Sequence, residues 1–202
     1  PGDIVFNESF ETTHYSILDS YGNAVSVTTT LNSNFGSKIM VPSLGFFLNN
    51  EMDDFSIKPG EPNIYGLIGG KVNSIEPQKR MLSSMTPTII EKDGKLSMIL
   101  GSPGGPTIIT SVLQTILNVY LFGDKINESV NHPRFYHLWL PDKIYLEKGA
   151  FDSQTVDSLK SLGYVINKKF SSIGRVDAIY IDKTNKIFTA ADPRGDDYSL
   201  GE

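Results

Sequence analysis

The pattern of apolar and polar positions near the start of the chain predicts a pair of β-strands. A strand-like run covers residues 13–18, and residues 24–28 alternate strictly between apolar and polar side chains. Residues 21–23, Tyr-Gly-Asn, are a turn signal between the two runs. Two such runs around a short turn are typical of a β-hairpin, whose far ends bring Thr12 and Thr30 close together.

The same type of reasoning predicts the other elements. Apolar residues ahead of a polar run indicate a short strand over 45–48, and further hairpins are expected over 86–91 with 96–100, around an Asp-Gly turn, and over 176–181 with 186–191. Helical spacing of apolar residues predicts helices over 107–122, 126–131 and 153–162. Strands at both ends with helices between them indicate the α+β class.

Composition limits the kind of protein that the chain can be. A chain of 202 residues with 39% hydrophobic content can bury one sizeable core, which favours a single domain. A net charge of -5 without a basic patch argues against nucleic acid or an anionic membrane as a partner. The chain has no cysteine, so disulfides and thiolate metal sites are excluded. No apolar run in the sequence is long enough to predict a membrane span, and no targeting segment is recognised.

Four polar motifs, in a fixed order and with fixed gaps, carry the candidate chemistry. They are Thr12-Thr13-His14-Tyr15-Ser16, Asn49-Asn50-Glu51-Met52-Asp53-Asp54-Phe55, Lys79-Arg80-Met81-Leu82-Ser83-Ser84-Met85-Thr86-Pro87-Thr88 and Gly101-Ser102-Pro103-Gly104-Gly105. Taken alone, a Thr-Thr string is ordinarily a strand former. As a set, the motifs resemble the small subunit of γ-glutamyltransferases (glutathione hydrolases), a family of N-terminal-nucleophile hydrolases. The resemblance covers residues 12–194.

The resemblance implies a fold, a domain division and a partner. The fold would be the small-subunit half of a four-layer αββα sandwich. Residues 1–11 would be the tail of the large-subunit side of a precursor, 12–194 the small-subunit domain and 195–202 a mobile C-terminal tail. The partner would be the large subunit of the same precursor, forming a heterodimer. The export signal of that precursor would imply a periplasmic or extracellular protein.

The resemblance also implies a nucleophile. The precursor would be cut between Glu11 and Thr12, after attack of the Thr12 hydroxyl on the preceding carbonyl and hydrolysis of the resulting ester. An α-amino group has a pKa of about 7.7–8.0, so the freed amine of Thr12 can act as base for its own hydroxyl at neutral pH. Thr30 would be the second hydroxyl, which orients the nucleophile. The local alternative for Thr30 is an ordinary strand threonine.

A run of amide and carboxylate side chains follows the apolar strand predicted over 45–48. Adjacent acidic residues usually mark a solvated turn, but after a buried strand they also suit a pocket for an ammonium group. By resemblance, Asn32, Glu51 and Asp54 would bind the α-amino group of a γ-glutamyl substrate. Relatives have either Gln or Glu at the position of Glu51.

Two successive serines, Ser83 and Ser84, can form a small anion site with their backbone amides. The resemblance assigns them to the α-carboxylate of the substrate, together with an arginine of the large subunit. Met81 stands where the bacterial enzymes have proline. The glycine- and proline-rich stretch 59–70 predicts a loop, and by resemblance it would be a lid over the active site, with Tyr65 at its inner end.

The glycines at the end of the fourth motif precede a predicted helix. Amides exposed at such a turn can stabilise an oxyanion, which places the predicted oxyanion hole at Gly104 and Gly105. A phosphate-binding loop is the rival interpretation, but the Lys-Ser/Thr pair that it needs is absent. The next residues, Pro106-Thr107, depart from the Ser-Arg that is common in the family.

The function predicted from the sequence is γ-glutamyl transfer and hydrolysis of glutathione and similar amides, without a metal or cofactor. His132 and His137 have neither the spacing nor the glutamate of a helical zinc site. The substrates would be a γ-glutamyl donor and water, an amino acid or a peptide as acceptor. Two alternatives stay open: an uncleaved or truncated inactive relative that acts as a subunit or binding protein, and a related amide hydrolase of the cephalosporin acylase or poly-γ-glutamate processing type.

Overall fold

A four-stranded antiparallel sheet forms the centre of the computed structural model, which describes residues 12–167 and 172–201. In spatial order its strands are β11 (Ile187–Ala190), β10 (Asp177–Ile181), β6 (Lys95–Gly101) and β5 (Thr88–Lys92). Both hairpins predicted for this region, β5–β6 and β10–β11, are therefore confirmed. The two hairpins join side by side because β10 pairs with β6.

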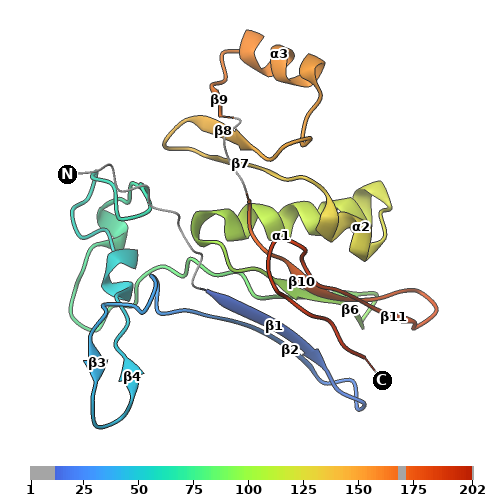
Figure 1. Cartoon of the computed structure of the whole chain (residues 1–202), viewed down its shortest axis with the longest axis horizontal. Coiled ribbons are helices and arrows are strands. Elements are labelled where there is room, and N and C mark those ends of the chain that lie inside the picture. The colour runs from blue at the N-terminus through green and yellow to red at the C-terminus, as the bar shows by residue number, and fades with distance from the viewer. Residues whose placement is uncertain (1–11, 168–171, 202) are drawn as a thin grey trace.

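One layer covers each face of this sheet. Helices α1 (Ile108–Leu117) and α2 (Ile126–Asn131) lie on one side, and the hairpin of β1 (Thr13–Leu18) and β2 (Ala24–Thr29) lies on the other (Figure 1). The described residues thus form helix, sheet and sheet layers in that order. This is the α+β arrangement expected for the small-subunit half of an αββα sandwich.

The central strand β6 explains why the layers hold together. Met98 and Leu100 are fully buried in a cluster that includes Val112 of α1 and Val130 of α2. Successive side chains of a strand point to opposite faces, so Ile99 lies on the hairpin side, where it is also fully buried. A strand covered on both faces reads as a continuous apolar run, as residues 98–100 of β6 do.

The β1–β2 hairpin is formed as the alternation predicts. The turn is stabilised by Asp19, whose carboxylate accepts hydrogen bonds from the backbone amides of Tyr21 and Asn23. The register pairs Thr13 with Thr29. Thr12 and Thr30, one residue beyond this pair, therefore emerge from the same end of the hairpin.

The predicted helix over 107–122 is present but is not uniform. A 3₁₀ turn at Gly105–Thr107 precedes α1, and a π-helical turn at Asn118–Phe122 follows it. By length and composition alone, the stretch Gly105–Phe122 could cross a membrane, with a mean hydropathy of 1.3. Its inner face packs into the protein core instead, through Ile108, Val112 and Val119.

A small subdomain above α1 in Figure 1 is absent from the sequence prediction except for its helix. It consists of β7 (Phe135–Leu138), β8 (Lys143–Leu146), β9 (Ile166–Asn167) and α3 (Ser153–Ser161). Asp152 caps α3 by accepting a hydrogen bond from the Thr155 amide at 2.7 Å. The second core cluster, with Ile144, Leu146 and Val156, lies between this helix and β8.

Buried ion pairs tie this subdomain to the central sheet. The Arg134 guanidinium lies 2.8 Å from Asp192, and Arg194 lies 2.6 Å from Glu147. The Glu147 carboxylate also accepts the backbone amides of Arg134 and Ile173. Opposite charges with additional hydrogen bonds compensate for the cost of removing these groups from water.

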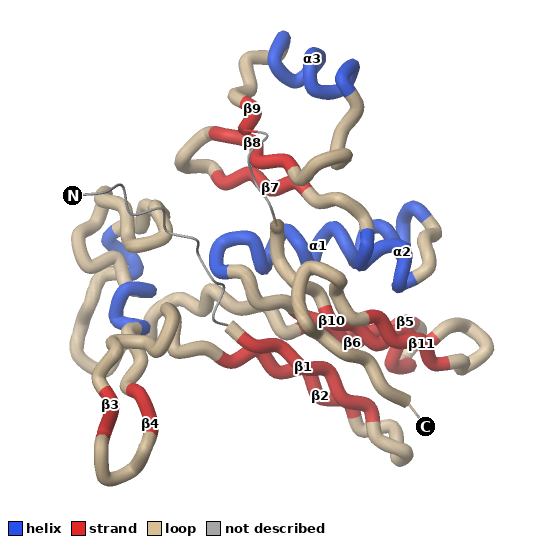
Figure 2. The backbone as a smooth tube through the Cα atoms, viewed as in Figure 1, coloured by secondary structure: helices blue, strands red, loops and turns tan. Residues whose placement is uncertain are grey.

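Residues between β2 and β5 are mostly loop, as Figure 2 shows. The strand expected over 45–48 is reduced to β4 (Phe46–Phe47), which pairs with β3 (Met40–Val41). Two 3₁₀ turns follow, at Glu51–Asp54 and Lys71–Asn73. At the other end of the chain, Asp197 forms an ion pair with Arg175 at 2.9 Å, so part of the C-terminal tail lies against the sheet.

Candidate active site

The predicted nucleophile lies at the open end of the β1–β2 hairpin. The Thr12 hydroxyl donates a hydrogen bond to the Thr30 hydroxyl, with 3.1 Å between the oxygens. Thr12 is only 7% exposed. The antiparallel register of β1 and β2 brings Thr12 and Thr30 close together, as the sequence predicted. Glu11, the other residue of the predicted cleavage site, lies outside the described residues.

The turn that follows β2 brings Asn32 to the same place. The backbone amide of Asn32 donates to the Thr30 hydroxyl at 2.9 Å, and its carbonyl accepts the Tyr65 hydroxyl at 2.5 Å. Asn32 has a φ of 77°, in the left-handed region that asparagine tolerates better than most residues. Tyr65 of the predicted lid loop therefore contacts the turn that holds Thr30.

A small pocket brings together seven of the predicted site residues. Its lining consists of Thr12, Thr30, Asn32, Asp54, Tyr65, Leu67, Ser84, Gly105, Pro106 and Ile108. The pocket volume is about 20 Å³, which holds no more than a water-sized group. Two of the lining residues, Tyr65 and Leu67, belong to the loop over residues 59–70.

Asp54 is the acidic side chain of this pocket. Burial is the main reason why its pKa is raised above the ordinary value; the Ser84 hydroxyl opposes this shift, and the charge of Asp53 adds to it. Ser84 donates to Asp54 at 3.4 Å. A half-buried carboxylate with a raised pKa is stabilised when a cation binds next to it. The residues around Asp54 thus favour an ammonium ligand.

Glu51 and Ser83 are neighbours of the pocket but are not among its lining residues. Glu51 begins the 3₁₀ turn that ends at Asp54, and burial, followed by the charge of Asp54, raises the pKa of Glu51. The exposed Ser83 bonds locally, to the backbone of Met85. The substrate-binding roles predicted for Glu51 and Ser83 remain predictions.

The two glycines before α1 have positive φ values, 135° for Gly104 and 51° for Gly105. A side chain at Gly104 would place its Cβ 2.6 Å from the Thr107 hydroxyl, which donates to the Gly104 carbonyl. Glycine is therefore needed for this turn. Gly105 lines the pocket with Thr12, whereas Gly104 is not among the lining residues. Their role as oxyanion hole remains a prediction.

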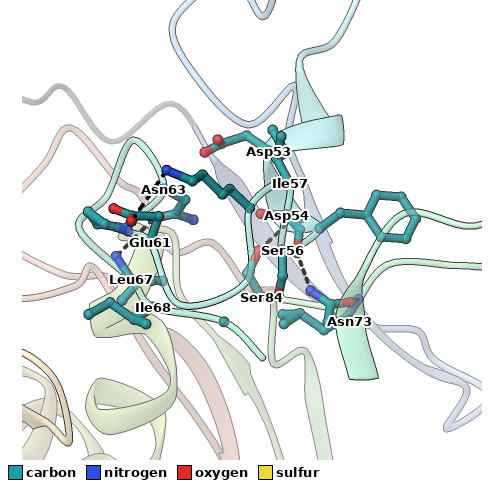
Figure 3. A pocket seen from close by; sticks show the side chains of 15 residues that line it. Asp53, Asp54, Ser56, Ile57, Glu61, Asn63, Leu67, Ile68, Asn73 and Ser84 are labelled. Atoms are coloured by element: carbon teal, nitrogen blue, oxygen red, sulfur yellow. Dashed lines mark hydrogen bonds and ion pairs between the residues drawn. The ribbon is translucent and has the colours of Figure 1, made fainter. Parts of the chain in front are cut away.

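A second cavity of about 440 Å³ lies next to this pocket and shares Asp54, Leu67 and Ser84 with it. Figure 3 shows Asp54 and Ser84 facing each other at its wall, with the lid loop residues Asn63 and Leu67 opposite. The carbonyl of Asp54 accepts a hydrogen bond from the Asn73 amide group at 2.6 Å. Because Leu67 lines both cavities, the loop over residues 59–70 borders the two of them.

The structure also reveals residues around the site that the sequence did not single out. His14, two residues after Thr12, is buried, and its ring bonds with the hydroxyls of Thr28 and Ser16. Burial lowers the pKa of His14 to about 4. His14 is therefore neutral at pH 7. Ser16 and Thr28 occupy polar positions in the alternating pattern of the hairpin. This alternation is the sequence signal for their contact with His14.

No group of three or more metal-binding side chains occurs in the part of the chain that the structure describes. His132 contacts Asp124 at 3.4 Å, and His137 contacts Asp142 at 2.8 Å. His132 and His137 thus contact different acidic residues.

The layered fold and the paired threonines at the open end of the β1–β2 hairpin place the chain among the N-terminal-nucleophile hydrolases. A family model described as Gamma-glutamyltranspeptidase matches residues 4–201. The chain belongs to this gamma-glutamyltranspeptidase family.

Individual relatives agree with this assignment. The glutathione hydrolase proenzyme of Escherichia coli is 48% identical over 202 residues, which is 100% of this chain and 34% of that protein. The chain thus spans about a third of the length of such curated relatives. A mutant of the Helicobacter pylori gamma-glutamyltranspeptidase matches with a TM-score of 0.85 and 49% identity, covering 91% of this chain and 100% of the solved one.

A more distant likeness concerns the fold alone. The cephalosporin acylase of Bacillus halodurans matches with a TM-score of 0.78 and 22% identity, over 94% of this chain and 34% of that chain.

Proposed function

We propose that the protein transfers and hydrolyses γ-glutamyl groups of glutathione and similar amides, with Thr12 as an N-terminal nucleophile. The observation that supports this most directly is the hydrogen bond between Thr12 and Thr30 in a pocket that also holds Asp54, Ser84 and Gly105. A nucleophile, a cation-binding carboxylate, a hydroxyl donor and a glycine turn are the groups that attack on a γ-glutamyl amide needs.

The first step of this mechanism creates the nucleophile. The Thr12 hydroxyl attacks the carbonyl carbon of Glu11, the peptide bond breaks, and its nitrogen becomes the free α-amine of Thr12. Water then hydrolyses the ester and releases the carboxylate of Glu11. The Thr30 hydroxyl accepts the Thr12 hydrogen bond, so it orients a lone pair of the Thr12 oxygen for attack.

The second step is acyl transfer. The free α-amine takes the hydroxyl proton of Thr12 while the oxygen bonds to the γ-carbonyl carbon of the substrate. The amides of Gly104 and Gly105 stabilise the oxyanion. The amide bond to the leaving group then breaks, the proton passes to the departing nitrogen, and a γ-glutamyl ester of Thr12 remains. Water or an acceptor amine restores the free hydroxyl.

The polar side chains in and next to the Thr12 pocket would bind the α-amino and α-carboxylate groups of the γ-glutamyl substrate. Its α-ammonium group would bind Asp54, with Asn32 and Glu51 close by, and its α-carboxylate would bind Ser84 and Ser83. Burial raises the pKa of Asp54, and a bound ammonium ion would reverse that cost. Tyr65 would close the site, because its hydroxyl bonds the Asn32 carbonyl. The lid would open for water or the acceptor amine to reach the ester.

The partner in this proposal is the large subunit of the same precursor. The chain spans about a third of the length of the proenzymes that it resembles. The outer face of α1 and of the π-helical turn after it exposes an apolar row at a spacing of four residues, made up of Ile109, Leu113, Leu117 and Leu121. The hairpin likewise exposes Tyr15 and Ile17. Exposed apolar faces of this kind are typical of subunit interfaces.

The experiment that tests the proposal compares the precursor with its Thr12→Ala and Thr12→Ser variants. We expect the unsubstituted precursor to give a fragment that begins at Thr12 by mass spectrometry, and to release amine from a γ-glutamyl anilide. Thr12→Ser should keep both reactions, and Thr12→Ala should lose both. Turnover by Thr12→Ala would refute the mechanism. An uncleaved, inactive natural protein would support the subunit or binding-protein alternative.

A substrate panel separates the proposal from other amide hydrolases. An Asp54→Asn variant should raise KM for γ-glutamyl anilide but not for glutaryl anilide, which lacks the α-amino group. Preference of the natural protein for an acyl-lactam over glutathione would favour the acylase alternative instead.

A further inference from the structure

The turn at residues 30–33 needs an external support. It links the end of β2 to the pocket, and it contains Thr30 and Asn32, yet none of its residues belongs to a strand or helix. Asn32 has a φ of 77°, a conformation that is uncommon for a residue other than glycine. Such a conformation persists when surrounding contacts determine it.

Asn50 provides contacts to each of the residues 31–33. Its backbone amide donates to the Leu31 carbonyl at 3.1 Å, and its carbonyl accepts the Asn32 side-chain amide at 3.2 Å. Its side-chain oxygen accepts both the backbone amide of Ser33 at 3.0 Å and the Ser33 hydroxyl at 2.9 Å. A single residue therefore holds three consecutive residues of the turn.

We propose that Asn50 is a positioning residue for the nucleophile, an inference that rests on the function proposed above. Asn50 is not among the residues that line the Thr12 pocket. Asn50 would act through the turn. The backbone amide of Asn32 donates to the Thr30 hydroxyl, and the Thr30 hydroxyl accepts the hydrogen bond from the Thr12 hydroxyl. A shift of the turn would misorient the acceptor of the Thr12 hydrogen bond.

The side-chain oxygen of Asn50 is the part that mutation can test, because the two backbone contacts are available to both alanine and aspartate at this position. Asn50→Ala removes the acceptor for Ser33, whereas Asn50→Asp keeps an acceptor oxygen at the same place. We expect Asn50→Ala to lower kcat by about 10- to 100-fold, since small misplacements of a reacting group have effects of this size. KM should change much less, and Asn50→Asp should recover most of kcat.

A matched control is Asn131→Ala, which removes an exposed asparagine that bonds only within α2. It should leave kcat, KM and self-cleavage unchanged. Kinetics should be measured on folded protein after the thermal transition of each variant is checked. An Asn50→Ala protein with kcat within about twofold of the natural one would overturn the inference. So would an Asn50→Asp variant as slow as Asn50→Ala, because the acceptor oxygen would then not be responsible.

Hydrogen exchange separates this inference from the proposed function. In Asn50→Ala, a peptide covering residues 30–34 should exchange faster than in the natural protein, whether or not either protein turns over substrate. Faster exchange with an inactive natural protein would refute the function but not the support of the turn. Unchanged exchange together with an active natural protein would refute the positioning role alone.

Discussion

The Thr12 hydroxyl lies 3.1 Å from the Thr30 hydroxyl and donates to it, although the two residues are 18 positions apart in the chain. The hairpin between them brings the two residues together. Residues one step beyond the terminal pair of Thr13 and Thr29 lie at the same end of the hairpin. Local structure therefore makes Thr12 and Thr30 neighbours, and the turn that Asn50 contacts follows Thr30 directly.

The first prediction concerns this pair. Thr30→Val keeps the shape of the side chain but removes the oxygen that accepts both the Thr12 hydroxyl and the Asn32 amide. We expect self-cleavage and turnover to slow by about 10- to 100-fold, because the nucleophile loses its orienting partner. Thr30→Ser should stay within about tenfold of the natural rate. The measurements are mass spectrometry of the precursor over time and initial rates on a γ-glutamyl anilide.

A second prediction concerns the lid. Tyr65→Phe removes the hydroxyl that donates to the Asn32 carbonyl. One hydrogen bond contributes about 0.5–1.5 kcal/mol, so the open population of the loop should rise by up to about tenfold. Faster hydrogen exchange over residues 62–68 is the expected readout. Tyr21→Phe, at the tip of the hairpin where this side chain is 90% exposed, is the control and should change nothing. Equal exchange in both variants would contradict a closing role for Tyr65.

Much of the fold can be predicted because its signals are local. The hairpins have alternating strands and short turns, and α1 follows a glycine turn. The sheet of β7, β8 and β9 had no such signal. Its strands have two to four residues, and β9 pairs with β8 in parallel only after α3 has crossed between them. Long-range pairing of short strands is not visible in a sequence pattern.

The candidate site shows a similar division. The motifs indicated which residues matter, and the structure gathers Thr12, Asp54, Ser84 and Gly105 around one pocket. The sequence did not indicate that Ser83 would bond locally, away from that pocket. Nor did it indicate the support from Asn50. Both depend on the loop path between β2 and β5, which has almost no regular structure to predict.

A third prediction is that His14 makes the free energy of unfolding depend on pH in the acidic range. Burial lowers the pKa of His14 from 6.5 to about 4 in the folded protein, while the unfolded chain keeps the ordinary value. Between pH 4 and 6.5 the unfolded state therefore binds more protons, and the free energy of unfolding rises with pH across this window. The term is about 2 kcal/mol after allowance for solvent screening. His14→Gln lacks this term, so in urea unfolding the stability of the natural protein relative to His14→Gln should increase from pH 4 to pH 7.

Asp177 changes the free energy of unfolding with pH in the opposite direction to His14. Burial, followed by the charge of Asp197, raises the pKa of Asp177 from 3.8 to about 7, and its Oδ1 atom has no hydrogen-bond partner among the residues that the structure describes. The folded state binds the extra proton between pH 3.8 and 7, so the free energy of unfolding falls as pH rises through this window. Below pH 3.8 Asp177 is protonated in both states and does not change the free energy of unfolding. Above pH 7 it is ionised in both states, and burial of its charge destabilises the folded protein by the full amount.

The fourth prediction follows from this sign. Asp177→Asn should match the natural protein near pH 4 and be more stable by about 1–2 kcal/mol at pH 8, after allowance for solvent screening. Exposed Asp157→Asn is the matched control and should show no such divergence. Because the His14 and Asp177 terms have opposite slopes, the natural protein should show a flatter stability profile than either His14→Gln or Asp177→Asn. A profile of Asp177→Asn parallel to that of the natural protein from pH 4 to pH 8 would contradict the raised pKa.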